Sequence, residues 1–405
     1  MSKKSPQLRF EGFTDDWEER KLSDLFIKGG SGGTPKSTNK AFYDGDIPFL
    51  GISDITKSNG FINNTEKHIS SDGLNSSAAW IVSKGAISLA MYASVGKLAI
   101  LNIDAATSQA FYNMIFDDYD LRDLVYQRLN KANELSEWNK LISTGTQSNL
   151  NADKVKNFQM YLPKNHDEIK LISTFFKQID NTIALHQRKL DLLKEQKKGY
   201  LQKMFPKNGA KVPELRFAGF ADDWEVRKLN EVSDIYDGTH QTPKYQDNGV
   251  MFLSVENIKT LTSNKFISRE AFEDEFKIRP QRGDVLMTRI GDIGTANVVE
   301  TDEDLAYYVS LALFKSEELN PYFLQASIYA PFVQDQIWKR TLHIAFPKKI
   351  NKNEIGQVPI NVPTLAEQTK IGSFFKQLDK TIALHQRKLD LLKEQKKGFL
   401  QKMFV

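Results

Sequence analysis

The chain has 405 residues, of which 40% are hydrophobic and 26% are charged, a composition typical of globular proteins with more than one domain. It contains no cysteine, which excludes disulfides and thiolate metal sites and favours a cytoplasmic location, and no apolar run of roughly 18 residues that would predict a membrane-spanning helix. The net charge is only +4, which excludes a uniformly basic protein.

The chain opens with a segment that occurs twice. Residues 6–22 read PQLRFEGFTDDWEERKL and residues 213–229 read PELRFAGFADDWEVRKL, and the two match at 13 of 17 positions. The acidic pairs before Trp17 and Trp224 could suggest catalysis. However, the tryptophans and their neighbouring phenylalanines favour a structural role, in which they fasten these entrance segments to the remaining fold.

A variable segment follows each entrance segment. The two variable segments look different, yet weak correspondences run through them in the same order. Residues 46–55 correspond to 249–258, and residues 84–87 correspond to 282–285. We therefore expect one shared mixed α/β fold with different surface residues.

Each half then ends in a long helix, predicted at residues 164–205 and 363–405, with a linker at 206–213. Residues 175–205 and 374–404 match at 28 of 31 positions, and both carry a heptad seam of apolar residues. The seam comprises Ile179, Ile183, Leu190, Leu193 and Tyr200 in the first helix, and Leu378, Ile382, Leu389, Leu392 and Phe399 in the second. Because a lone seam needs a partner, the two helices are expected to pair antiparallel about a pseudo-two-fold axis.

Polar groups within these helices have local explanations. His186, Lys197, His385 and Lys396 are predicted to fix the register or to lie at the edge of the seam. Thr364 with Glu367 predicts a capping box at the start of the second helix, and Asn165 with Glu168 predicts a similar N-cap pair at the start of the first. Residues 175–205 carry a net +4 and residues 374–404 a net +5, so everything else carries −5. A DNA-binding surface outside the helices would therefore be a local patch.

The duplicated motifs LRF-x-GF-x-DDWE-x-RKL and ALHQRKLDLLKEQKKG resemble those of the specificity subunit of type I restriction–modification enzymes, its staphylococcal members in particular. The resemblance covers essentially the whole chain, and the order of variable domain, shared helix, variable domain and shared helix is itself diagnostic. It implies an α+β fold with two mixed α/β target recognition domains, residues 1–163 and 214–362, separated by two long antiparallel coiled-coil helices.

The resemblance also implies a function and partners. Each recognition domain would read one half of a split site in double-stranded DNA, and the helices would set the distance between the halves. Two methylation subunits that bind S-adenosylmethionine and two motor-nuclease subunits that use ATP and magnesium would join the chain. The chain itself would hold no cofactor and no metal.

The sequence agrees with a subunit that has no catalytic residues. No two prolines are adjacent, so the N/D-P-P-Y/F motif of amino-methyltransferases is absent. Gly96-Lys97 lacks the remaining residues of a phosphate-binding P-loop. The glycine-rich residues 29–33 predict a flexible loop, because their spacing does not match a phosphate-binding motif.

Polar residues at matching places in both domains are the candidate DNA contacts, since base edges and phosphates are bound by such side chains. The first pair of loops offers Lys36, Ser37, Thr38, Asn39 and Lys40, and Thr239, His240, Gln241 and Lys244. The second pair offers Tyr92, Ser94 and Lys97, and Arg289 and Asp292, beside glycines that predict tight turns. The third pair offers Thr146, Gln147 and Asn149, and His343, Lys348 and Lys349.

Two alternatives stay open at this point. The chain could be a coiled-coil adaptor whose two domains bind proteins or glycans, because neither domain is strongly basic. A self-sufficient nuclease or methyltransferase is disfavoured by the missing motifs. Enrichment of a bipartite DNA motif from a random duplex library would separate the first alternative from DNA reading.

Overall fold

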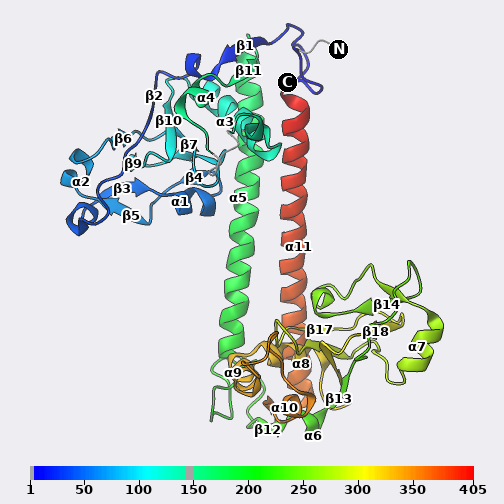
Figure 1. Cartoon of the computed structure of the whole chain (residues 1–405). Helices are drawn as coiled ribbons and strands as arrows, with labels where there is room; N and C mark the ends of the chain where they lie inside the picture. The colour runs from blue at the N-terminus through cyan, green and yellow to red at the C-terminus, as the bar shows by residue number, and fades with distance from the viewer. Residues whose placement is uncertain (1–3, 143–148) are drawn as a thin grey trace. The chain divides into compact units, whose positions relative to one another are not determined.

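The computed structural model describes residues 4–142 and 149–405 (Figure 1). The chain forms two compact units, and each is described by itself. Unit 1 comprises Met1–Arg188 and Arg387–Val405, and unit 2 comprises Lys189–Gln386. The long helices α5 (His166–Lys203) and α11 (Leu365–Met403) contribute residues to both units. Within the described ranges, no helix combines the length and the apolar character needed to cross a membrane.

Unit 1 holds two sheets and a two-stranded ribbon. The five-stranded sheet has the order β2-β10-β7-β8-β4, with strands Lys28–Ser31, Phe111–Ile115, Ile87–Ala90, Leu98–Leu101 and Phe61–Ile62. The four-stranded sheet has the order β5-β3-β9-β6, with strands Lys67–Ile69, Ile47–Leu50, Ala105–Thr107 and Ile81–Val82. In the ribbon, β1 (Glu18–Lys21) pairs antiparallel with β11 (Gln159–Leu162).

The helices of unit 1 pack on these strands. They are α1 (Ile52–Lys57), α2 (Ser71–Asn75), α3 (Tyr119–Glu134) and α4 (Ala152–Lys156), with short 3-10 turns η1 (Leu22–Asp24), η2 (Lys40–Tyr43) and η3 (Glu137–Lys140). Strands β7 and β8 are buried at every position, as expected of strands covered on both faces. The apolar side of α3 covers them and joins the same core. The side chain of Asp118 begins α3 by accepting hydrogen bonds from two backbone amides.

Unit 2 repeats this plan with different residues. One sheet has the order β13-β19-β16-β17, with strands Asp234–Asp237, Leu311–Lys315, Val285–Thr288 and Ala296–Val298. The other has the order β15-β14-β18, with strands Phe266–Ile267, Val250–Leu253 and Leu305–Tyr307. The ribbon pairs β12 (Glu225–Lys228) with β20 (Pro359–Val362). The helices are α6 (Leu229–Val232), α7 (Arg269–Glu275), α8 (Pro321–Tyr329), α9 (Pro331–Arg340) and α10 (Lys352–Gly356), with the 3-10 turn η4 (Val255–Asn257).

The prediction of one fold shared by two different sequences is confirmed by the strand order. The order β2-β10-β7-β8 in unit 1 matches β13-β19-β16-β17 in unit 2, and a parallel pair lies in the second sheet of each unit. Equivalent glycines also make equivalent bonds. The amide of Gly85 donates to Leu101 at 2.7 Å, and the amide of Gly283 donates to Val299 at 2.9 Å.

The predicted helix seam faces inward in both units. All ten seam residues are buried or half-buried. In unit 1 the first part of α5 lies against the last part of α11, with the rings of Phe175 and Phe399 5.0 Å apart. In unit 2 the last part of α5 lies against the first part of α11, with the rings of Tyr200 and Phe374 4.9 Å apart. The helices therefore pair antiparallel within each unit, as predicted (Figure 1).

The seam lysines make ion pairs between the helices. Lys396 Nζ lies 2.7 Å from Asp180 Oδ1 in unit 1, and Lys197 Nζ lies 2.6 Å from Asp379 Oδ1 in unit 2. These are the same two positions of the repeat, used once in each unit. Because the pairs are only partly exposed, they favour one axial register of the helices over others.

The glycine-rich segment is not the flexible loop that its composition predicts. Residues 28–31 form strand β2, and Gly32 and Gly33 are buried behind it. A Cβ at Gly32 would collide with the carbonyl group of Thr107, and one at Gly33 would lie 2.6 Å from the backbone of Ala78. The glycines therefore permit close packing of two chain segments rather than mobility.

Candidate nucleic-acid interface

Each entrance segment is fastened to the start of a long helix by a buried ion pair. Arg9 Nε and Nη2 donate to the two oxygens of Glu168 at 2.6 and 2.8 Å, and the Glu168 side chain is 1% exposed. Trp17 Nε1 donates to the same carboxylate at 3.3 Å. In unit 2, Arg216 makes the equivalent fork to Glu367, with both bonds at 2.8 Å. The hydrogen bonds raise the pKa of Arg9 and Arg216, so both stay charged.

These contacts confirm a structural role for the entrance segments and correct one prediction. Trp17 and Trp224 are buried core residues, each in the hydrophobic core of its own unit. Asn165 does cap α5, because its side chain accepts from the amide of Asp167 at 2.8 Å. At the start of α11, Thr364 Oγ1 accepts from the amide of Glu367 at 3.4 Å, but the Glu367 carboxylate is occupied by the Arg216 fork and does not complete the predicted capping box. The Glu168 carboxylate is likewise occupied, by Arg9 and Trp17.

The first pair of candidate loops leaves the two folds at the same point. The amide of Gly33 donates to Thr107 at 3.0 Å, and the amide of Thr239 donates to Tyr307 at 3.1 Å. Beyond this point, residues 36–40 are all exposed. Asn39 caps η2 by accepting from the amide of Ala41, so its side chain is partly committed to local structure. In unit 2, His240, Gln241 and Lys244 are exposed and Thr239 is half-buried.

The second pair of loops forms equivalent hairpin turns, between β7 and β8 and between β16 and β17. The amide of Gly96 donates to Ala90 and the amide of Gly294 donates to Thr288, both at 3.0 Å. Both glycines have positive φ, 87° and 88°, which confirms the predicted tight turns. Tyr92, Ser94 and Asp292 are exposed, and Lys97 is half-buried.

Arg289 does not lie on this surface, contrary to prediction. Its guanidinium is buried, forms an ion pair with Asp237, and donates from Nε to the carbonyl of Ile350 at 3.1 Å. A buried and paired arginine cannot reach a base edge without breaking these bonds. The sequence pattern placed it in a polar turn, but its side chain turns inward and fixes that turn to the segment around Ile350.

The third pair of loops is described in one unit only. Thr146 and Gln147 lie outside the described residues, and Asn149 is half-buried. In unit 2, the candidate residues His343, Lys348 and Lys349 are exposed, as a residue that contacts DNA must be. The ring of His343 lies 4.1 Å from that of Trp338, and Lys348 Nζ lies 4.8 Å from the Trp338 ring.

The polar pattern did not predict the exposed apolar side chains in this loop and beside it. Trp338, near the end of α9, is 57% exposed, and Ile344 and Phe346 in the loop are fully exposed. Large apolar side chains in a polar, lysine-rich loop were the available signal, because such residues are normally placed in the core.

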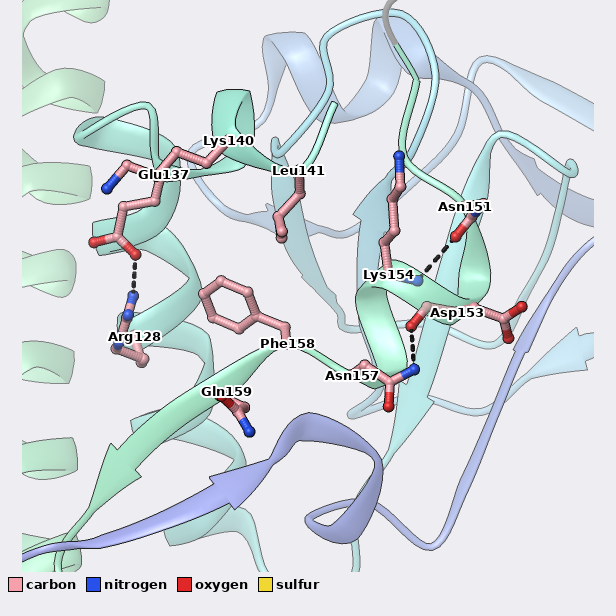
Figure 2. Close-up of a pocket in the computed structure, with 10 residues that line it drawn as sticks. All are labelled: Arg128, Glu137, Lys140, Leu141, Asn151, Asp153, Lys154, Asn157, Phe158 and Gln159. Atoms are coloured by element: carbon pink, nitrogen blue, oxygen red, sulfur yellow. Dashed lines mark hydrogen bonds and ion pairs between the residues drawn. The ribbon is translucent and has the colours of Figure 1, made fainter. Parts of the chain in front are cut away.

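A pocket of about 620 Å³ lies in unit 1, between η3 and α4 (Figure 2). Several of its polar side chains are bonded to the chain itself. Arg128 pairs with Glu137 at 2.9 Å, Asn151 accepts from the amide of Lys154 at 2.8 Å, and Asn157 donates to the carbonyl of Asp153 at 2.9 Å. Figure 2 shows the ring of Phe158 pointing between Arg128 and Leu141. These polar groups therefore hold local structure, and their arrangement is not that of a catalytic site.

The acidic and histidine side chains of Asp118, Asp120 and His166 have ligand atoms within 4.8 Å of one another. Asp118 is already occupied, since it caps α3 and lies 2.9 Å from His166 Nε2. Burial acts to raise the pKa of Asp118, but the hydrogen bonds from Leu121, His166 and Asp120 lower it overall. The group joins the starts of α3 and α5 and gives no reason to assign a metal.

A model of the type I restriction modification DNA specificity domain matches the chain twice, at residues 14–195 and 221–394. The chain belongs to this family. Each match spans one recognition domain and most of the helix that follows it, so the internal repeat seen in the sequence is a repeat of the family's own domain.

Relatives of this specificity subunit match either nearly all of the chain or about two fifths of it. The MjaVIII specificity subunit of Methanocaldococcus jannaschii is 24% identical over 414 residues, covering 95% of this chain and 91% of the relative. The HindI specificity subunit of Haemophilus influenzae is 29% identical over 174 residues, covering 41% of this chain and 37% of the relative. The crystal structure of the S subunit from M. genitalium aligns with a TM-score of 0.68 at 14% identity, covering 99% of both chains.

A second solved structure, from work on assembly of the type I restriction–modification system, aligns with a TM-score of 0.51 at 16% identity, covering 96% of this chain and 97% of that chain. These likenesses confirm the predicted fold class. Specificity subunits confer sequence specificity and are not catalytic, so this chain is not an enzyme.

Proposed function

We propose that each recognition domain of this specificity subunit reads one half of a bipartite DNA site. The observation that carries the proposal is that the two units share backbone bonds while differing in the side chains of the loops. The turns at Gly96 and Gly294 are closed by the same bond, yet one presents Tyr92 and Ser94 and the other Asp292. A fixed fold that presents different base-contacting groups is suited to reading two different half-sites.

The way each recognition domain is attached favours independent reading. In unit 1 the first and last strands pair directly, from Glu18 with Leu162 to Lys21 with Gln159. In unit 2 Glu225 pairs with Val362 in the same way. Each domain is therefore inserted between two strands that lie side by side, and the strands close the insertion whatever it contains.

We propose that the long helices set the gap between the half-sites. Both are continuous, with 38 residues in α5 and 39 in α11, and both contribute to each unit. Docking geometry fixes half-site spacing when two readers share a rigid connection. The interhelical pairs of Lys197 with Asp379 and of Lys396 with Asp180 hold the connection in one register.

The same helices are the proposed docking site for two methylation subunits. Leu185 and Leu192 of α5 are exposed, as are the equivalent Leu384 and Leu391 of α11. Each pair is spaced by one heptad and forms a short apolar stripe that the seam does not use. Identical stripes on both helices suit two copies of one partner.

The remaining partners follow from the same assignment. The methylation subunits would bind S-adenosylmethionine, and two motor-nuclease subunits would bind ATP and magnesium, with the assembly working in the cytoplasm. The absence of cysteine is compatible with a reducing compartment.

Selection from a random duplex library tests the proposal. The specificity subunit, assembled with methylation subunits, should enrich a motif of two half-sites separated by a constant gap. Exchange of residues 23–160 for the same segment of another specificity subunit should change one half-site and leave the other and the gap unchanged. Insertion of one heptad into both α5 and α11 should change only the gap. Failure of the assembled complex to enrich any motif would refute DNA reading.

A further inference from the structure

A short hairpin projects from unit 2 at residues 342–349. Its two ends are joined by the amide of Leu342, which donates to the carbonyl of Lys349 at 2.8 Å. The amide of Gly291 donates to Lys348 at 2.8 Å, and that of Ile350 donates to Arg289 at 2.9 Å. The hairpin is thus fixed to the turn between β16 and β17, one of the loops assigned to DNA reading.

The tip of this hairpin is apolar and has no cover. Ile344 is 99% exposed and Phe346 is 104% exposed, whereas aromatic side chains of this size normally lie in the core. Within the described residues of unit 2, no aromatic ring contact to Phe346 occurs, although Trp338 at the base is packed with His343. A fully exposed ring on an anchored hairpin indicates a binding surface, because exposure costs free energy in the unbound protein.

The surroundings of the tip identify the kind of partner. Between Gln336 and Asn353 the chain carries five Lys or Arg residues and no Asp or Glu, although everything outside the two heptad segments has a net charge of −5. Lys348 and Lys349 directly follow the tip and are exposed. The basic residues at the foot of the hairpin complement the phosphates of a duplex. The apolar tip complements the stacked bases.

We propose that the hairpin inserts Phe346 between neighbouring base pairs of the half-site read by unit 2. Lys348 and Lys349 then contact the phosphates on either side of the opened step. This inference rests on the proposed reading of DNA and adds a local distortion of the duplex to it. Apolar wedges of this kind unstack one step and bend the duplex, which makes specificity depend on how easily that step opens.

The test uses the full chain assembled with methylation subunits and a duplex that carries the selected motif. The fluorescent base 2-aminopurine is placed at successive positions of both half-sites, since its emission rises when it is unstacked. We expect the emission to rise at one step of the half-site read by unit 2. That half-site is identified as the one that changes when residues 230–358 are exchanged. Phe346→Ala should abolish the rise and weaken binding by about 5- to 150-fold, the range for loss of one base–aromatic stack.

Two variants serve as controls. Ile278→Ala removes an exposed apolar side chain of unit 2 that lies outside the hairpin, and should leave the emission and the affinity unchanged. Phe346→Leu keeps an apolar wedge and should retain the rise in emission. Because Phe346 is fully exposed in the free chain, its replacement leaves the folded unit intact, which circular dichroism verifies.

The outcomes separate this inference from the proposed function. If the motif is bound but Phe346→Ala changes neither emission nor affinity, the insertion is wrong and DNA reading stands. If Phe346→Ala prevents assembly with the methylation subunits, the tip binds a protein and the insertion is also wrong. If the assembled wild-type complex selects no motif, DNA reading fails and the insertion fails with it.

Discussion

Replacing Arg9 with methionine should destabilise unit 1 by about 3–5 kcal/mol, the range for removing one partner of a buried ion pair. The magnitude follows from what the substitution leaves behind. Glu168 is 1% exposed, so its carboxylate would lose two charge-assisted bonds of 2.6 and 2.8 Å and could not recover them from water. The Trp17 N–H, at 3.3 Å, would be the remaining side-chain donor.

A second substitution separates the cost of an unpaired charge from the value of the pair. Arg9→Met combined with Glu168→Leu removes both charges, so most of the lost stability should return. A matched control is the surface pair of Arg20 and Glu18, whose side chains are 40% and 41% exposed. Arg20→Met should cost less than about 1 kcal/mol, because exposed pairs are solvated and screened.

The assay is urea unfolding of the full chain, followed by hydrogen exchange with peptide resolution so that the two units are measured separately. Arg9→Met should lower protection in unit 1 and leave unit 2 close to wild type. Arg216→Met should do the reverse, because Arg216 makes the same fork to Glu367. A loss below about 1 kcal/mol for Arg9→Met would refute the argument that the fork holds the entrance segment.

Three further predictions follow from single contacts. Lys197→Asp should destabilise the helix pair of unit 2 by about 1–2 kcal/mol, because the new carboxylate would face Asp379. Adding Asp379→Lys should restore the melting temperature, and a lack of rescue would show that the pair does not set the register. Gly96→Ala should lower the free energy of unfolding in urea by about 2–4 kcal/mol, because φ is 87° and the new Cβ would collide with the Trp138 ring. Gly291→Ala places its Cβ in open space and should cost only about 1 kcal/mol. Equal costs would contradict the packing argument. Lys36→Gln should reduce the slope of log affinity against log salt by about 0.9 if this lysine neutralises one phosphate, and an unchanged slope would remove it from the interface.

The fold could be predicted where the sequence repeats itself or has a clear period. The heptad spacing identified both helices and their inward faces, because apolar residues at these spacings can only be buried against a partner. The duplication then required the variable segments to share a fold, even though little of their sequence matches. The correspondence of residues 84–87 with 282–285 was sufficient to align β7 with β16, since both strands follow a glycine with positive φ.

The contacts that depend on side-chain direction could not be predicted. Glu168 matches a capping-box position, but only the structure shows Arg9 within reach of it from a distant part of the chain. Arg289 lies in a turn that suits DNA contact, yet its side chain points into the core. The sequence pattern assigns an apolar residue such as Phe346 to the interior, and only the structure shows that its ring is exposed.

The interhelical contacts also make the frame of entrance segments and long helices self-complementary. Asp180 and Lys197 both belong to α5. Asp180 pairs with the α11 residue equivalent to Lys197, and Lys197 pairs with the α11 residue equivalent to Asp180, because the two helices have nearly the same sequence. A second copy of α5 could therefore take the place of α11, pairing Asp180 of one copy with Lys197 of the other. We expect a fragment of residues 1–205 to form a dimer in sedimentation equilibrium, and Leu190→Asp, at a buried seam position, to convert it to a monomer. A wild-type fragment that stays monomeric at micromolar concentration would show that the seam needs both halves of one chain.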